Sequence, residues 1–263
     1  MKTNKYILII IFLISASFKP TEIVINGEFK MFTTDNIGNI YAVTHKNDII
    51  KYDKKGIKKA EINLKVLGNV SLIDASNPLE IYVYYQDQGI IKYFDNNLNT
   101  LGETNLFKTY DLNNIQVICR SYDNGIWFLD PINLKLRKCD KKGNLLTESV
   151  IISNFSDTAI SPQMILDDGK FVYLKINSKS LMKFDILANY LNTITLENFS
   201  TFQVKDENIF YKSNEGFWVY NTVSFEKTIF NYNFEKTYLN IRTEGNLLYL
   251  QDNQSIKVVE TTN

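Results

Sequence analysis

The sequence predicts an all-β domain built from one unit that is repeated six times. An aliphatic-aromatic pair recurs with 37 to 46 residues between successive aromatics, at Ile40-Tyr41, Ile81-Tyr82, Ile126-Trp127, Val172-Tyr173, Ile209-Phe210 and Leu248-Tyr249. A second anchor follows each pair, as at Ile50–Asp53 and Met182–Asp185. No stretch keeps the helical spacing for three turns. A period of about 40 residues made of short strands is typical of a β-propeller with four-stranded antiparallel blades, so we expect six blades.

Each unit divides into four strands. The first precedes an Asp- or Gly-containing turn, as at 115–120 and 202–205, and the second carries the aliphatic-aromatic pair. The third carries the Lys-aromatic-Asp anchor, and the fourth follows the next turn, as at 58–64 and 145–152. Turn residues that bond their own backbone or tolerate positive φ separate the strands. Asp35, Asp123 and Asp167 are assigned to such turns.

Residues 1–17 differ from the repeated units. Lys2 and Lys5 form a basic start, 6–14 is an unbroken apolar run, and 15–17 are small residues. This pattern predicts a signal peptide cleaved before Phe18, because the run is too short to span a bilayer. An uncleaved anchor is the alternative. No cysteine follows the run, so lipoprotein attachment is not expected. We therefore expect one propeller domain over 18–263, exported to the periplasm or cell surface, with no later membrane-spanning segment.

The first and last units predict how the ring closes. After Ile256–Val259 too few residues remain for a turn and a fourth strand, whereas the strand-like segment 22–25 precedes the first unit and belongs to no complete one. We expect 22–25 to supply the fourth strand of the last blade, which removes exposed sheet edges. The alternative is a ring closed by packing alone.

The first unit contains a sequence motif over residues 35–56, Asp-x-x-Gly-Asn-Ile-Tyr followed by Ile-x-Lys-Tyr-Asp-x-x-Gly. It resembles the NHL-type repeat of six-bladed propellers, although the usual Arg before the third strand is absent. The resemblance implies a six-bladed ring. It leaves the activity open, because such propellers include protein-binding platforms as well as lactonases, lyases and peptidases.

Composition excludes several classes of partner and chemistry. The 29 basic and 29 acidic residues give zero net charge, so nucleic acid is not an expected partner. Phosphate-binding Gly-rich loops are absent. Only three arginines are present and there is no Asp box, so the sequence does not favour a sialidase.

The two cysteines are not expected to form a disulfide. Cys119 and Cys139 fall on the first and third strands of one unit, roughly 9–10 Å apart, beyond the ~7 Å that a disulfide needs. We expect two buried free thiols and no cofactor.

Catalytic candidates are sparse. His45 is the only histidine and falls at a hairpin tip, which disfavours a Ser-His-Asp triad or a Cys/His zinc site. The resemblance allows a divalent cation held by carboxylates and amides around the axis, for which Asp74, Asn240 and Glu244 are candidates. We lean towards a non-catalytic protein.

The first strands are expected to line a central channel, with one apolar face packed between blades and one polar face towards the channel. A mouth of positive character would hold an anionic group or an acidic side chain of a partner, and the candidates are Lys30, Gln116, Arg120, Gln163, Gln203, Lys205, Asn240 and Arg242. A merely water-filled polar channel is the alternative. Clustered aromatics at 82–85 and 217–220 are expected mostly between blades, with one or two available on a rim as partner anchors.

The function predicted from these observations is an exported protein-interaction scaffold of the cell envelope, as an accessory subunit of an envelope assembly or export complex. Two alternatives remain. One is a divalent-cation-dependent hydrolase or lyase of the six-bladed type. The other is a binder of an anionic small molecule or glycan at the channel mouth.

Overall fold

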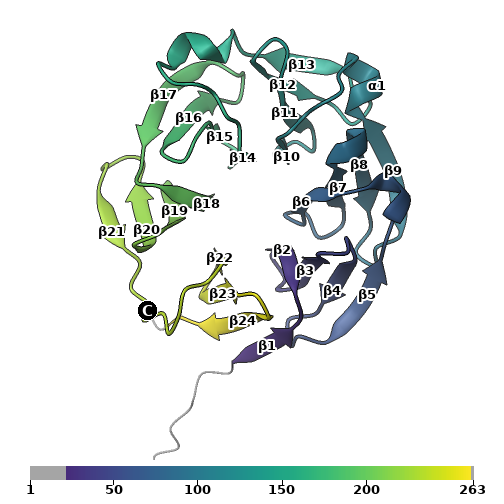
Figure 1. Cartoon of the computed structure of the whole chain (residues 1–263), viewed down its shortest axis with the longest axis vertical. Coiled ribbons are helices and arrows are strands. Elements are labelled where there is room, and N and C mark those ends of the chain that lie inside the picture. The colour runs from purple at the N-terminus through teal and green to yellow at the C-terminus, as the bar shows by residue number, and fades with distance from the viewer. Residues whose placement is uncertain (1–21, 262–263) are drawn as a thin grey trace, which may run out of the picture.

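The computed structural model describes residues 22–261 as a closed ring of six blades, each a four-stranded antiparallel sheet (Figure 1). Blades 1 to 3 consist of β2 (Phe29–Thr34), β3 (Ile40–Thr44), β4 (Ile49–Tyr52) and β5 (Lys58–Ile62); β6 (Val70–Asp74), β7 (Ile81–Tyr85), β8 (Ile90–Phe94) and β9 (Thr100–Asn105); and β10 (Ile118–Arg120), β11 (Ile126–Asp130), β12 (Lys135–Cys139) and β13 (Leu145–Glu148).

Blades 4 to 6 repeat the arrangement. They consist of β14 (Met164–Asp167), β15 (Phe171–Lys175), β16 (Ser180–Asp185) and β17 (Tyr190–Thr195); β18 (Phe199–Lys205), β19 (Asn208–Ser213), β20 (Gly216–Asn221) and β21 (Lys227–Ile229); and β22 (Asn240–Glu244), β23 (Leu247–Gln251), β24 (Ser255–Glu260) and β1 (Ile23–Asn26). The first strand of every blade borders the centre of the ring. The predicted six-bladed propeller is confirmed.

The ring closes as predicted, with an N-terminal strand completing blade 6. β1 pairs with β24 in antiparallel register, from Ile23 opposite Val258 to Asn26 opposite Ser255. The observed strand begins and ends one residue later than the predicted 22–25. Ile25 is buried and packs with Phe29 of blade 1. The seam therefore combines a hydrogen-bonded ladder with apolar burial.

One Asp-turn recurs between third and fourth strands. The carboxylate of Asp140 accepts hydrogen bonds from the backbone N–H groups of Lys142 and Asn144 at 2.8 Å, and from Asn144 Nδ2 at 2.8 Å. Asp95 and Asp185 form the same set of bonds with the residues that follow them. The regular placement of Asp in the repeat is thus turn chemistry, as predicted.

Some strands are shorter than predicted, and other hydrogen bonds are found beyond the ends of two of them. β10 begins at Ile118 and not at 115, and the Ile115 carbonyl accepts the Tyr84 hydroxyl of blade 2 at 2.7 Å. β13 ends at Glu148 and not at 152. The Ser149 N–H still donates to the Leu136 carbonyl, and a 3₁₀ turn follows at Ile152–Phe155. The predicted strand 58–64 is β5, which ends at Ile62.

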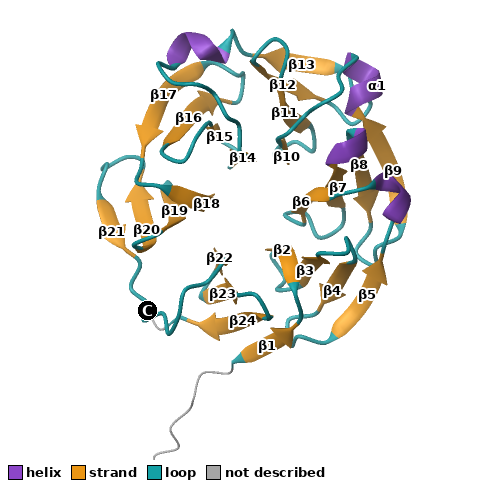
Figure 2. Ribbon diagram, viewed as in Figure 1, coloured by secondary structure: helices purple, strands orange, loops and turns teal. Residues whose placement is uncertain are grey.

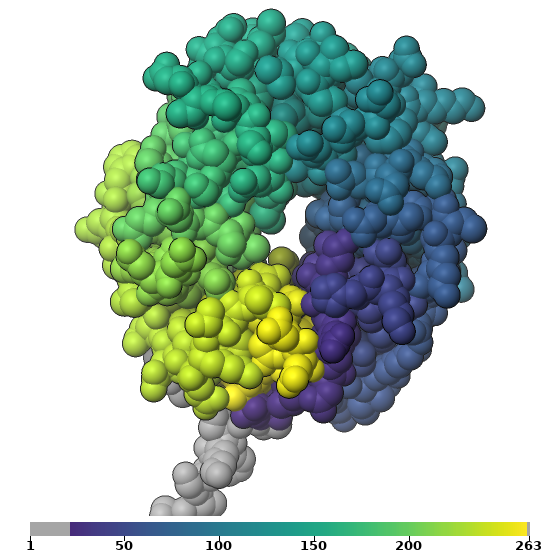
Figure 3. All heavy atoms as spheres, in the orientation of Figure 1, coloured from purple at the N-terminus to yellow at the C-terminus, as the bar shows by residue number. Residues whose placement is uncertain are grey.

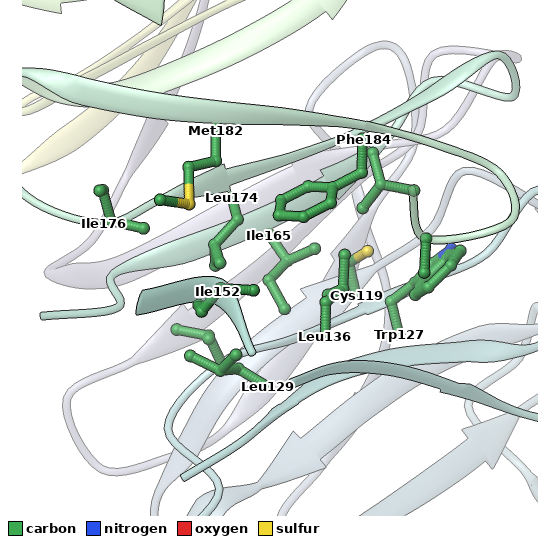
Figure 4. Packing of buried hydrophobic residues seen from close by; sticks show 13 residues of the cluster. Cys119, Trp127, Leu129, Leu136, Ile152, Ile165, Leu174, Ile176, Met182 and Phe184 are labelled. Carbon is green, nitrogen blue, oxygen red and sulfur yellow. The ribbon is translucent and has the colours of Figure 1, made fainter. Parts of the chain in front are cut away.

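The core lies between the blades. Figure 4 shows the cluster between blades 3 and 4, where Cys119, Trp127 and Leu136 meet Ile165, Leu174, Met182 and Phe184. The next cluster, between blades 2 and 3, contains Ile118 together with Tyr82 and Tyr84. Adjacent residues Ile118 and Cys119 thus pack against opposite neighbours. In β10 both faces are therefore buried between blades, contrary to the expectation of one polar face towards the channel, whereas β22 turns Asn240, Arg242 and Glu244 to the central cavity.

Helical structure is confined to the connections (Figure 2). It comprises α1 (Leu106–Tyr110) and the 3₁₀ turns Lys65–Leu67, Gln86–Gln88 and Ile152–Phe155. None of the helices in the described part of the chain has the length and apolar character needed to cross a membrane. The predicted signal peptide, 1–17, lies outside the described residues.

Candidate functional site

The six first strands surround a central cavity of about 690 Å³. The space-filling view shows its opening in the middle of the ring (Figure 3). Every blade contributes lining residues, including Thr33, Ser71, Arg120, Asp167, Gln203 and Arg242. A volume of this size suits a ligand group or a few side chains of a partner.

The cavity has two chemically different ends. Since the blades repeat one another, all six first strands run through the ring in the same direction, and the turns that follow them share one face. We call this the turn face; it holds residues 35–39, 75–80, 121–125, 168–170, 206–207 and 245–246. The opposite, linker face holds the connections between blades.

The eight predicted mouth residues do not meet at one mouth. Lys30, Gln116 and Gln163 lie at or just before the beginning of β2, β10 and β14, and so belong to the linker face. Lys30 Nζ donates to Asn69 Oδ1 at 2.6 Å and to the Val70 carbonyl at 2.7 Å. None of these three lines the cavity, whereas Arg120, Gln203, Lys205, Asn240 and Arg242 do. Position along the first strand accounts for part of this division, since Arg120, Gln203, Lys205 and Arg242 lie further along their strands, while Asn240 lines the cavity from the first position of β22.

Arg120 is already fully engaged. Its side chain is buried, donates from Nη1 to the Glu80 carbonyl at 2.7 Å, lies 3.4 Å from Glu80 Oε1, and also bonds Asn124 Oδ1. Its guanidinium stacks 4.3 Å from the centre of the Tyr82 ring. Arg120 therefore joins blades 2 and 3 and is unsuited to the role of free anion ligand.

Gln203 and Lys205 are also held by neighbours on blade 6. Gln203 Nε2 donates to the Thr243 carbonyl at 2.8 Å, and its Oε1 accepts from the Thr243 N–H at 3.1 Å. Lys205 Nζ lies 3.6 Å from Glu244 Oε1. Both ends of the Gln203 amide thus have a partner on blade 6, whereas Lys205 keeps donor capacity towards the cavity.

Arg242 differs from the other candidates. Its Nε donates to Thr34 Oγ1 at 2.8 Å. Among residues 22–261 this is its single hydrogen bond, and no carboxylate oxygen lies within 4.0 Å of it. Burial lowers the pKa of the Arg242 guanidinium, while the more distant carboxylates of Glu244 and Asp74 act in the opposite direction. The cavity therefore presents a half-buried cation with unused N–H donors.

The candidate metal ligands Asp74, Asn240 and Glu244 all line the cavity. Asp74 Oδ1 accepts from the N–H and hydroxyl of Ser76, at 2.9 and 2.6 Å. Over residues 22–261 no three His, Cys, Asp or Glu side chains gather closely enough to hold a metal ion together. His45 is exposed in the β3–β4 hairpin, on the linker face.

Cys119 and Cys139 are free and buried, as predicted. They lie on β10 and β12, with β11 between them, and belong to clusters on opposite faces of blade 3. Burial raises the pKa of Cys139 to about 11 and that of Cys119 well above its ordinary value. Both thiols therefore stay protonated and unreactive.

Three exposed apolar residues at the tips of turns on the turn face were not predicted from the sequence. Ile37, Leu79 and Tyr122 project from the turns of blades 1, 2 and 3 and are 59%, 76% and 55% exposed. The corresponding turns of blades 4 to 6 carry Asp168, Lys170, Asp206, Glu207 and Asn246. Comparing the turns of the six units with one another, position by position, would have revealed this asymmetry.

Each apolar tip is held in place by a carboxylate or amide. Asp35 Oδ1 accepts the Ile37 N–H at 3.1 Å, and Asn77 Oδ1 accepts the Leu79 N–H at 3.0 Å. Asp167 of blade 4 accepts the Tyr122 N–H at 3.2 Å. Asp167 also accepts Ser121 Oγ and Trp127 Nε1, both at 2.8 Å. Such pre-ordering lowers the entropy cost of binding a partner.

Comparison by sequence gives no relative: no protein-family model matches the chain, and neither does any curated protein. Comparison by structure gives many similar chains. Virginiamycin B lyase from Staphylococcus aureus has a TM-score of 0.63 at 11% identity, over 92% of this chain and 100% of the lyase chain.

Two further structures show the same similarity. A catalytically inactive form of that lyase with quinupristin, in which a histidine is replaced by alanine, has a TM-score of 0.59 at 14% identity, over 87% and 79% of the two chains. The extracellular domain of a putative hybrid two-component system from B. thetaiotaomicron has a TM-score of 0.58 at 12% identity, over 89% of this chain and 34% of that one. At these identities the similarity defines the class of protein, a six-bladed β-propeller.

Proposed function

We propose that this chain is an exported, non-catalytic propeller that binds a protein partner with its turn face. The observation that carries the proposal is the group of three neighbouring apolar tips, Ile37, Leu79 and Tyr122, beside the mouth of a polar cavity. Exposed, pre-ordered apolar side chains next to a polar cavity are typical of protein interaction sites. The occupant is a segment of a partner protein with apolar side chains for blades 1 to 3.

The polar half of the face fits the same kind of partner. Turns of blades 4 and 5 place Asp168, Asp206 and Glu207 opposite the apolar tips, around a smaller pocket of about 290 Å³. Lys170 and Lys205 line the same pocket, so three acidic and two basic side chains leave an excess of one negative charge. A segment with apolar residues at one end and a basic residue at the other would match both halves, because complementary charges fix its direction.

Export and an envelope location form part of the proposal. The basic start, apolar run and small residues of 1–17 support cleavage before Phe18. A similarly folded extracellular domain shows that the fold serves outside the cytoplasm in another protein. We place the protein in the periplasm or at the cell surface, as an accessory subunit of an envelope assembly or export complex.

We also propose that the blades are of the NHL type, because residues 35–56 carry the motif of that repeat.

The histidine content supports binding over the chemistry of the similar lyase. That enzyme becomes catalytically inactive when one histidine is replaced. The present chain has a single histidine, His45, which lies on the linker face, away from the apolar tips. A histidine cannot act as acid or base in the turn-face mouth of this cavity.

Site-specific photocrosslinking tests the proposal. A benzophenone amino acid replaces Leu79, Tyr122 or, as the control, Val66, which is 82% exposed on the linker face. The protein is produced in its native host and irradiated in intact cells. We expect the same partner protein in the Leu79 and Tyr122 adducts and its absence from the Val66 adduct. No adduct at either turn-face position, or the same adduct at Val66, would contradict the proposal.

A further inference from the structure

Two of the three arginines have carboxylate partners and the third does not. Arg137 Nη1 lies 2.6 Å from Asp130 Oδ2, and its Nε lies 2.9 Å from Glu148 Oε2. Arg120 contacts Glu80. Arg242 lines the cavity with one hydrogen bond, to Thr34, and no carboxylate within 4.0 Å among the described residues. Arg242 is half-buried, and a partly desolvated cation without a carboxylate partner is not fully compensated by the fold, which directs attention to a partner outside the fold.

Polar residues on the same strand as Arg242 also line the central cavity. Side chains alternate along a strand, so Asn240, Arg242 and Glu244 share one side of β22. All three line the cavity. Asn240 makes no side-chain hydrogen bond within the described chain. The cavity therefore offers cationic and neutral polar groups that the fold leaves unused.

We infer that Arg242 anchors a carboxylate-binding site in the central cavity, and that the ligand is a carboxylate of the bound partner, either an aspartate or glutamate side chain or its C-terminus. This inference rests on the proposed function, since the partner's apolar side chains would bring the carboxylate to the mouth. The planar guanidinium still has its two Nη groups to form the paired hydrogen bonds that a carboxylate accepts.

The other charges of the cavity favour a single negative charge. Asp74, Asp167 and Glu244 also line it, so a doubly charged phosphate would meet three carboxylates. Lys205 lies near Glu244 and offsets part of that charge. One carboxylate paired with Arg242 and bonded to the Asn240 amide satisfies the site without adding excess negative charge.

An NMR titration tests the inference directly. The chain has only three arginines, so ¹⁵N-labelled protein gives three Nε–H signals, which the Arg242→Lys variant assigns. The probes are acetyl-Leu-Glu-Leu-amide, its neutral isostere acetyl-Leu-Gln-Leu-amide, acetyl-Leu-Leu with a free C-terminus, and inorganic phosphate, all at constant ionic strength. The first and third probes distinguish a side-chain carboxylate from a C-terminal one.

We expect the Arg242 signal to shift saturably with a carboxylate peptide and not with the Gln isostere. Arg242→Gln should weaken that binding at least about tenfold, as loss of a charge-assisted pair predicts. The matched control, Lys170→Gln, removes an exposed cation from the same face and should change binding less than about twofold. Arg242→Lys keeps the charge without the planar fork and should fall between them.

Three results would overturn the inference: equal binding of the Glu and Gln peptides, wild-type binding by Arg242→Gln, or tighter binding of phosphate than of either carboxylate peptide. The Glu-against-Gln comparison uses unmodified protein, so it holds even if a variant misfolds. A partner crosslinked at Tyr122 with equal yield in Arg242→Gln would refute the carboxylate site alone. Peptide binding without any crosslinked partner would instead refute the proposed function alone.

Discussion

Arg242 Nε and Thr34 Oγ1 lie 2.8 Å apart although 208 positions separate them in the chain. The bond crosses the seam where blade 6 meets blade 1, next to the β1–β24 ladder that closes the ring within blade 6. A neutral hydroxyl accepts one of the guanidinium's five N–H donors and leaves its charge uncompensated. The seam thus holds a charged group that the fold itself does not need.

Replacing Arg242 should therefore stabilise the protein. Arg242→Met removes a half-buried charge that has no carboxylate partner, and we expect the free energy of unfolding to rise by about 1 kcal/mol. Arg120→Met is the control: it leaves the Glu80 carbonyl and Asn124 without their partner and should lower stability by about 2 kcal/mol. Urea denaturation measures both. Destabilisation by Arg242→Met would mean that Arg242 supports the fold.

Ring closure by β1 predicts a sharp difference between two neighbouring residues. Ile25→Ala opens a cavity in the seam cluster and should cost about 2–4 kcal/mol. Val24→Ala lies on the same strand with its side chain half exposed, and should change stability by less than about 0.5 kcal/mol. Thermal and urea unfolding compare the two variants. Equal effects would show that β1 does not close the ring in solution.

Lys175 predicts a pH dependence of stability. The side chain is buried, and its Nζ donates to the carbonyls of Phe199 at 2.7 Å and Ser200 at 3.1 Å. Burial lowers the pKa of Lys175 to about 8, from an ordinary value of 10.5. Below pH 8 the ammonium is charged in both states and its burial cost is complete; above pH 8 the folded state loses the proton first. Its contribution to stability should rise from pH 8 to 10.5.

The comparison variant for that prediction is Lys175→Met. The stability of the wild type relative to Lys175→Met should increase by about 1–3 kcal/mol between pH 7 and pH 10. Lys179→Met, four positions further along and exposed, is the control and should show no such trend. A flat difference across that range for Lys175→Met would mean that the two carbonyls hold the ammonium charged throughout.

The thiols predict a simple chemical result. Cys119 and Cys139 are buried and unpaired, so Ellman's reagent should detect no thiol in the folded protein and two after denaturation. A reducing agent should leave the thermal midpoint unchanged, because no disulfide constrains the unfolded chain. Fewer than two thiols in denaturant, or a midpoint lowered by reduction, would reveal a covalent bridge.

The repeat in the sequence predicted most of the fold because its signals are local. Strand residues, Asp-turns and their spacing act within about ten residues, so the six units and the closing strand could be identified. Boundaries failed next to contacts with another blade, as at Ile115, whose carbonyl accepts the Tyr84 hydroxyl of blade 2 ahead of β10. Such bonds depend on which blades become neighbours.

The candidate site shows the same division more strongly. Of the eight polar residues predicted from the sequence, five line the cavity. The sequence could not separate Arg120, which is paired with Glu80, from Arg242, which has no carboxylate partner among the described residues. The tips Ile37, Leu79 and Tyr122 looked like ordinary turn residues until the ring placed their turns on one face.

The sequence by itself determined the scaffold: six antiparallel blades, an N-terminal strand in the last one, turn aspartates and unpaired cysteines. These features follow from residue spacing and from the reach of the backbone. Only the tertiary structure decided which polar groups meet, which cations find carboxylates, and which face carries the apolar tips. Those relationships join blades that are far apart in the chain, because charge pairing and exposure depend on distances in space. The closed ring brings Arg242 beside Thr34 and leaves its charge unpaired in the cavity.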